Sequence, residues 1–304
     1  MNAYVAVLIS VIAGGLLAPI GFTVLGDTSA RNRVRRIFLQ YVFALLIVIA
    51  ITGDLRFSLD VWPIFVTGIF VTGGVFFQWR AKAWSLSRSI IFLSLANVIP
   101  LILSAIFLHE WRALMNPWLA LGVSCALGGL GLHAWHSFRL AKEDEKKKGS
   151  KQKVPGEFYI YGVVFMVIFG VATFFENNWA KTGVPISDFL RAWYSGTFIG
   201  SFAMLCGSGL LSDKPSDGER KLNMTQEVAM TFFLAACIVV SLWTMFVSLQ
   251  YFELTVILPF YSVCIVLGYT LVSVFFKEWK LSDRRGLVLL GLGIVGAIII
   301  ATVR

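Results

Sequence analysis

Ten long apolar stretches dominate the chain, and short polar segments separate them. They cover approximately residues 4–25, 36–53, 61–79, 89–108, 116–136, 158–178, 187–211, 227–249, 254–276 and 286–303. Most reach the roughly 17–25 residues that a membrane-spanning helix needs. Backbone groups in lipid must be satisfied within their own segment, and the alternation typical of barrel strands is missing. The pattern therefore predicts an all-α polytopic membrane protein with ten transmembrane helices.

Basic residues are distributed unequally between the two sets of connecting loops. Of the 26 lysines and arginines, 21 follow odd-numbered apolar stretches. Because cytoplasmic loops carry an excess of positive charge, we expect the odd-numbered loops in the cytoplasm and both termini outside it. The compact loops fit the inner (plasma) membrane of a bacterium.

Composition and motifs remove several classes of function. Hydrophobic residues make up 58% of the chain and charged residues 14%, which excludes an ordinary soluble domain. The net charge of +9 is explained by topology, so we expect no nucleic-acid partner. The four cysteines form no CxxC pair, and nucleotide-binding, nucleophile-elbow and zinc-protease motifs are missing. We therefore expect neither an enzyme nor a metal site nor a cofactor.

One polar linker, residues 142–156, divides the chain into two halves, 1–141 and 157–304, with five apolar stretches each. The halves echo one another. The fourth stretch ends in Phe-Leu-His-Glu-Trp at 107–111, and the ninth ends in Phe-Phe-Lys-Glu-Trp at 275–279, an offset of 168 residues. A glycine-rich stretch follows in both halves. These echoes indicate an internal duplication.

Because each half has an odd number of spans, the second copy enters the membrane from the opposite side. The predicted fold is therefore two inverted five-helix repeats, an architecture that many secondary transporters use for alternating access. In such carriers the substrate site lies near the middle of the membrane, between the repeats.

This organisation resembles the drug/metabolite transporter superfamily, in particular its ten-helix EamA-like carriers. The likeness covers nearly the whole chain. Its clearest stretch runs from Val66-Thr67-Gly68 through Gln78-Trp79 and Pro100 to Glu110 and Gly131. In that superfamily the first four helices of each half line the substrate cavity, and the fifth is peripheral.

A weaker resemblance points to the sugar-porter branch, particularly bacterial rhamnose–proton symporters. It rests on Lys277-Glu278-Trp279 and on Phe175-Glu176-Asn177. The chain also departs from the superfamily. Metabolite exporters usually have glycine before the glutamate that follows the fourth and ninth spans, and here those positions hold His109 and Lys277.

A polar solute needs convergent hydrogen-bonding groups in an apolar cleft. The candidate substrate-binding residues are polar or aromatic side chains in the predicted cavity-lining helices. They are Gln40, Gln78, Asn97, Asn177, Arg191, Tyr194, Trp243 and Tyr261. An isolated amide in a span can instead bind a neighbouring helix.

Ionisable residues inside spans are costly and therefore of functional interest. Glu176 and Arg191 lie near the outer ends of the sixth and seventh spans and could form an ion pair. The pair could gate the outer entrance, or Glu176 could carry a coupling proton. For Glu110 and Glu278, at span ends, we expect capping or loop contacts.

The sequence thus predicts a secondary transporter that moves a small polar solute, with a sugar and a coupling proton as the leading choice. One alternative is an exporter of amino acids, drugs or other metabolites on the same scaffold. Another is a non-transporting membrane scaffold or receptor. The expected partners are the solute and the lipid bilayer, and the oligomeric state stays open.

Overall fold

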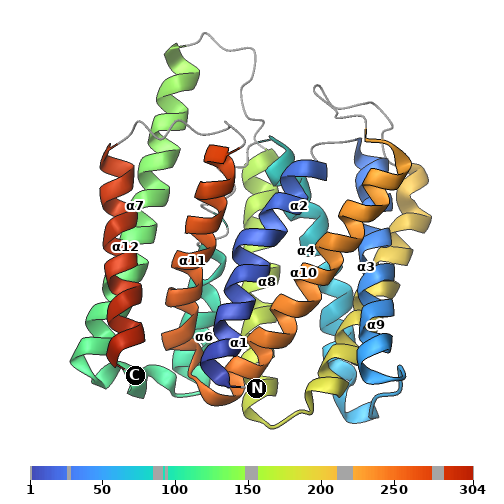
Figure 1. The fold of residues 1–304 in the computed structure, drawn as a ribbon, viewed down its shortest axis with the longest axis horizontal. Coiled ribbons are helices and arrows are strands. Elements are labelled where there is room, and N and C mark those ends of the chain that lie inside the picture. Colours follow the sequence, from blue (N-terminus) through green and yellow to red (C-terminus); the bar gives the residue numbers. More distant parts are fainter. Residues whose placement is uncertain are drawn as a thin grey trace. The chain divides into compact units, whose positions relative to one another are not determined.

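In the computed structural model of the chain, residues 2–25, 29–84, 92, 95–147, 157–210, 222–275 and 284–303 are described. Every regular element in these ranges is a helix (Figure 1). Eight helices are long and apolar enough to cross a membrane, which confirms an all-α polytopic membrane protein. They are the continuous helix Ala3–Leu25, α3 (Ala30–Thr52), Leu59–Ala81, which includes most of α4 (Trp62–Trp84), α7 (Pro117–Lys147), α8 (Glu157–Lys181), α10 (Met224–Tyr251), α11 (Leu254–Phe275) and α12 (Arg284–Val303).

The other two predicted spans also contain helices. The seventh stretch forms α9 (Ile186–Gly207), but Asp188 and Arg191 in its first two turns make it more polar than the eight. The fourth stretch forms the shorter helix α6 (Val98–Phe107), and part of the segment before it lies outside the described residues.

Two helices extend six or more residues beyond the apolar stretches that predicted them. Helix α3 begins six residues before its stretch, because the Ser29 hydroxyl accepts a hydrogen bond from the Asn32 amide and caps the helix. Helix α7 continues to Lys147, into the predicted linker, with an exposed Arg139–Glu143 pair one turn apart. A pattern of apolar residues does not detect polar residues at the end of a helix.

The first span is irregular in its middle. Between α1 (Ala3–Ser10) and α2 (Ala18–Leu25), residues Val11–Leu17 form a π-helical segment that contains Gly14 and Gly15. Such segments widen the helix and are frequent at functional sites.

The described chain forms two compact units. Unit 1 comprises residues 1–83 and 179–250, and unit 2 comprises residues 84–178 and 251–304. The units do not coincide with the two sequence halves, because each contains helices from both.

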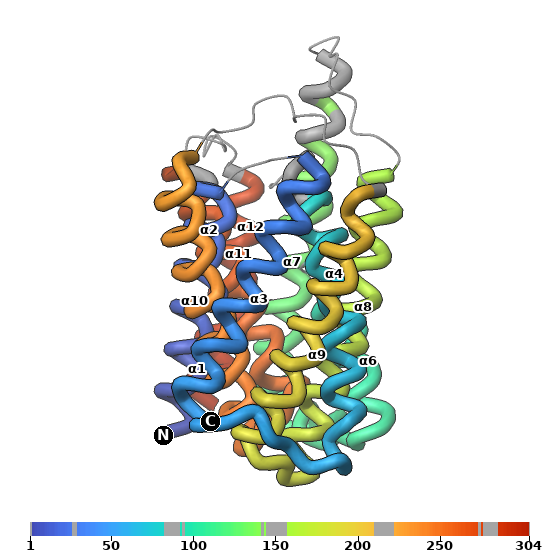
Figure 2. Tube along the Cα trace, turned by 90° about the vertical axis from the view of Figure 1, so that its right-hand side faces the viewer, coloured from blue at the N-terminus to red at the C-terminus, as the bar shows by residue number. Residues whose placement is uncertain are grey.

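In unit 1, helix α9 packs against both α3 and α4. Figure 2 shows α3 and α9 side by side, and Phe38 of α3 contacts Phe198 and Phe202 of α9. Glycines allow the approach of α4 to α9, since a Cβ on Gly68 would lie 3.1 Å from the Thr197 amide nitrogen. Close backbone approach through small residues is typical of helix packing in membranes.

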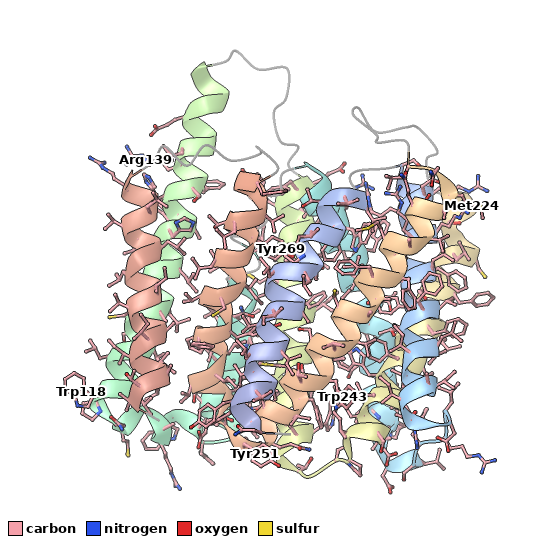
Figure 3. All side chains as sticks on the ribbon, in the orientation of Figure 1. Trp118, Arg139, Met224, Trp243, Tyr251 and Tyr269 are labelled. Atoms are coloured by element: carbon pink, nitrogen blue, oxygen red, sulfur yellow. The ribbon has the colours of Figure 1, made fainter. Side chains whose placement is uncertain are left out.

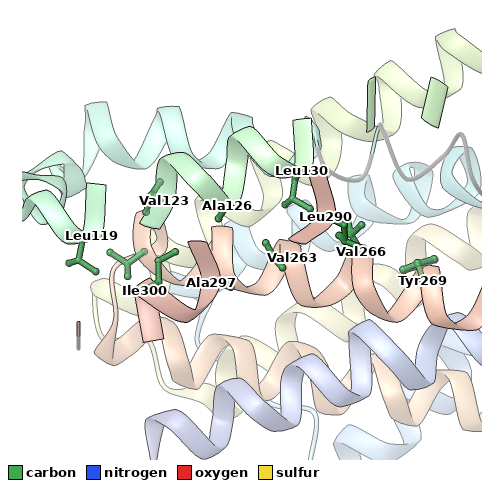
Figure 4. Close-up of a cluster of buried hydrophobic side chains, with 11 residues drawn as sticks. Leu119, Val123, Ala126, Leu130, Val263, Val266, Tyr269, Leu290, Ala297 and Ile300 are labelled. Carbon is green, nitrogen blue, oxygen red and sulfur yellow. The ribbon is translucent and has the colours of Figure 1, made fainter. Parts of the chain in front are cut away.

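In unit 2, helices α7 and α12 run side by side along most of their length (Figure 1). A Cβ on Gly129 would lie 2.5 Å from the Gly293 amide nitrogen, so neither backbone has room for a larger residue there. An apolar cluster from α7, α11 and α12 surrounds this contact (Figure 4). Its members are Leu119, Val123, Ala126, Leu130, Val256, Val263, Val266, Tyr269, Leu290, Ala297 and Ile300.

Three of the packed helix pairs join spans at equivalent positions of the two sequence halves. These are α3 with α9, α6 with α11, and α7 with α12. Each pair is antiparallel. The end of α3 meets the start of α9 through Thr52 and Arg191, and the segment that follows α6 meets the start of α11 through Glu110 and Thr255.

Candidate functional site

A buried group of polar side chains lies in unit 2, and we name it the Glu110 cluster. It consists of Ser104, Glu110, Asn177 and Thr255. The Asn177 amide nitrogen donates to the Ser104 hydroxyl at 3.1 Å and to Glu110 Oε1 at 2.8 Å. The other oxygen of Glu110, Oε2, accepts from the Thr255 backbone N–H at 3.0 Å. One carboxylate therefore joins α8 to α11.

Local backbone geometry brings Glu110 to this position. Helix α6 ends at Phe107, and His109 then adopts a left-handed conformation with φ of 55°. This turn starts the short helix Glu110–Met115 and directs the Glu110 side chain to the beginning of α11. The first amides of a helix have no intrahelical partner and carry partial positive charge. Glu110 thus caps α11, in agreement with the capping role expected from the sequence.

Among the described residues of this unit, two carboxylates are buried. Glu110 is 6% exposed and Glu176 is 5% exposed. Among the described residues, no arginine, lysine or histidine forms an ion pair with either of them. Among the described residues, the Glu110 carboxylate is stabilised by neutral hydrogen-bond donors, the Asn177 amide and the Thr255 N–H. Glu176 Oε1 and Asn177 Oδ1 have no hydrogen-bond partner in the described part of the chain. A buried charge without a counter-charge costs several kcal/mol, so the Glu176 carboxyl is suited to bind a mobile proton, and the Asn177 oxygen can accept a hydrogen bond from a polar ligand.

A second polar contact in unit 2 involves a predicted substrate residue. The Asn97 side-chain nitrogen donates to the Ser262 hydroxyl at 2.6 Å, which joins α6 to α11. Ser262 in turn donates to the Leu258 carbonyl, one residue before the proline inside α11, Pro259. Asn97 therefore makes the helix-to-helix contact that an amide in a span can make.

Within unit 1, Arg191 binds the end of α3. Its guanidinium donates to the Thr52 and Arg56 carbonyls, both at 2.8 Å, and pairs with Asp54 at 3.0 Å. Asp188 lies 3.7 Å away, one turn earlier on α9. Glu176 belongs to unit 2, and its pairing with Arg191 stays a prediction of the sequence. The contact closes the carbonyl end of α3, where a cation is electrostatically favoured.

Arg36 performs a similar task elsewhere in unit 1. It is 3% exposed and donates to the Leu25 carbonyl at the end of α2 and to Glu227 of α10, both at 2.8 Å. Sequence reasoning missed this residue, because it counted Arg36 with the loop arginines that determine topology. Its neighbour Arg33 is also buried, at 6% exposure.

The remaining predicted residues occupy different depths. In unit 1, Gln40 of α3 is 1% exposed, with Oε1 unpartnered among the described residues, and Tyr194 of α9 is fully buried. Gln78 of α4 and Trp243 of α10 are half-buried, and Figure 3 labels Trp243 in the lower part of α10. Tyr261 of α11, in unit 2, is also half-buried.

Three members of the polar contacts carried no distinguishing mark in the sequence. Ser104, Thr255 and Ser262 are hydroxyl residues in apolar stretches, and such residues often bond to their own helix backbone. Only the fold brings them to Asn177, Glu110 and Asn97. Glu278, the repeat equivalent of Glu110, lies outside the described residues.

Comparison with known proteins supports the fold without naming a function. No family model matches the chain, and no curated protein matches it. A solved crystal structure is similar over 99% of this chain and 96% of its own length, with a TM-score of 0.61 and 16% sequence identity. At that identity the similarity shows a shared fold alone.

Proposed function

We propose that this membrane protein is a secondary transporter of the drug/metabolite transporter type. It moves a small polar solute, with a sugar as the leading class and a proton as the coupling ion. The observation that carries the proposal is the pair of buried carboxylates, Glu110 and Glu176, in a membrane protein whose described residues offer them no counter-charge. Ionisable side chains are retained inside membranes chiefly along ion and substrate pathways.

The packing of equivalent helices supports the inverted-repeat architecture. If two repeats of opposite orientation are related by a pseudo-two-fold axis, the helices nearest that axis meet their own equivalents in antiparallel fashion. The pairs α3 with α9, α6 with α11 and α7 with α12 have this property. The helices α6 and α9 lie at the two remaining predicted spans, which supports a total of ten with the eight apolar helices. The orientation with both termini outside, in a bacterial inner membrane, belongs to the same proposal.

Within this proposal the two carboxylates have different tasks. Glu110 holds the start of α11 through the Thr255 amide and positions Asn177. Glu176, whose Oε1 has no partner in the described chain, takes up and releases the coupling proton. Asn97, Asn177 and Tyr261 of unit 2 and Gln40, Gln78, Arg191, Tyr194 and Trp243 of unit 1 remain the proposed substrate contacts.

A stability screen tests the substrate class. The purified protein is heated in detergent with a panel of sugars, amino acids and cationic drugs, since selective binding to the native state raises the unfolding midpoint. We expect a sugar to raise it, and Asn97→Ala to abolish the shift. Asn116→Ala is the matched control, because it removes an exposed helix-capping amide, bonded to the Trp118 N–H, away from the proposed contacts.

Each other outcome of the screen is informative. A shift with amino acids or cationic drugs alone would replace the sugar assignment by the exporter alternative. If Asn97→Ala and Asn116→Ala respond to the solute equally, Asn97 is only a helix contact. The absence of any shift would favour the scaffold or receptor alternative.

A further inference from the structure

An open apolar groove lies between α3 and α10 in unit 1. Its volume is about 570 Å³, and five of its six lining side chains are apolar. They are Phe43 of α3 and Met224, Thr225, Val228, Ala229 and Phe232 of α10. Met224 and Phe232 are 72% and 49% exposed, which in a membrane means exposed to lipid.

The groove follows the first turns of α10. Met224 is the first residue of the helix, and Figure 3 labels it at that end. Phe232 lies eight residues further on, about 12 Å along the axis at 1.5 Å per residue. There its ring meets Phe43 edge to face, with 5.6 Å between centroids, and closes the groove. The groove thus runs from the helix start, where the headgroups lie, toward the hydrocarbon core.

Two neighbouring arginines of α3, Arg35 and Arg36, lie toward the start of α10, because Arg36 bonds to Glu227 in the first turn of that helix. Arg36 lies two turns before Phe43 on nearly the same face of α3, and its pair with Glu227 neutralises the acidic group nearest the groove. The preceding residue, Arg35, is exposed and has no ion-pair or hydrogen-bond partner in the described part of the chain. Both α3 and α10 also begin at this end, so the positive ends of two helix dipoles lie near the open end of the groove.

We propose that this groove binds an anionic glycerophospholipid. One acyl chain lies along Val228, Ala229 and Phe232, and the phosphate meets Arg35. The apolar lining selects a hydrocarbon chain, and the charge at the open end selects an anionic headgroup over a zwitterionic one. Basic residues beside a membrane attract anionic lipid with a strength that corresponds to about a fivefold change in occupancy per arginine.

Native mass spectrometry of the full chain, loaded with palmitoyl-oleoyl phosphatidylglycerol or with phosphatidylcholine of the same chains, tests the proposal. We expect the wild type to retain phosphatidylglycerol several-fold better. Arg35→Gln should reduce this preference about fivefold. Ala229→Trp, which fills the groove with an indole, should remove the bound lipid of either kind.

Two matched controls keep the test specific. Ala301→Trp adds an indole to an exposed face of α12, and Arg112→Gln removes an exposed arginine from the short helix Glu110–Met115. Both should bind lipid like the wild type. Equal retention of the two lipids by the wild type would overturn the proposal, as would an Ala229→Trp variant that binds like Ala301→Trp. A preference unchanged in Arg35→Gln would also overturn it, because the headgroup would then be recognised elsewhere.

Discussion

His109 is the single described residue other than glycine with a positive φ, and it connects α6 to the Glu110 cluster. A left-handed conformation costs an L-residue roughly 1–2 kcal/mol. A glycine at this position would adopt the same conformation without that strain. The sequence revealed the departure from glycine, but the conformational demand became visible only with the fold.

We predict that His109→Gly raises the stability of the protein. The side chain of His109 is exposed, so little packing is lost, and glycine removes the left-handed strain at some entropic cost. The free energy of unfolding should rise by about 0.5–1 kcal/mol, measured as a higher midpoint of thermal unfolding. His109→Ala makes the same truncation without relief of strain and should show no gain. Equal midpoints for the two variants would contradict this explanation.

Arg191 was selected from the sequence as a gate or a substrate contact, and its described contacts are with the end of α3. Arg191→Lys should therefore destabilise the protein by about 2 kcal/mol, since an ammonium group cannot serve two carbonyls and a carboxylate in one plane. Hydrogen exchange should increase at the last turn of α3. Arg112→Lys, at an exposed position, is the control. Unchanged exchange in Arg191→Lys would show that the clamp does not hold the helix end.

At the scale of elements, the apolar pattern predicted the location of the spans well, because each span must be long and apolar to cross lipid. It predicted their ends less well. Helix α3 starts at the Ser29 cap, and α7 extends to Lys147, through polar residues that hydropathy ignores. The pattern also carries no tertiary information. It could not predict that each compact unit takes helices from both halves, or that Ser104 and Thr255 would meet Glu110 and Asn177.

The contact between α7 and α12 gives a prediction at the same scale. In Gly129→Ala the new Cβ would lie 2.5 Å from the Gly293 nitrogen and 2.9 Å from the Leu289 carbonyl oxygen, so the helices must separate. We expect the free energy of unfolding to fall by about 1–3 kcal/mol, as for other overpacked contacts. Gly128→Ala, one residue away, has nothing within 4 Å of its Cβ and should be neutral or slightly stabilising. Similar midpoints of thermal unfolding would contradict the close approach of the two helices.

At the scale of the whole molecule, alternating access needs bodies that keep their own packing while the site changes its exposure. The described chain has two compact units, each with internal contacts between equivalent spans. In the proposed function, the buried carboxylates of unit 2 would place the proton site inside one of these units. The sequence predicted Glu176 as an ionisable residue in a span, and it predicted Glu110 as a cap. The hydrogen bond between Glu110 and Asn177, the residue next to Glu176, became visible only in the fold.

The most direct test of the central claim is solute-driven proton movement in proteoliposomes that contain a pH-sensitive dye. The account predicts that a solute from the panel, a sugar first, changes the internal pH with the wild type. It also predicts that Glu176→Gln abolishes this change but still exchanges labelled solute across the membrane. Glu157→Gln, at the first residue of α8 and outside the buried cluster, should behave like the wild type. If no solute of the panel moves protons or exchanges in the wild type, the protein is not the proposed transporter.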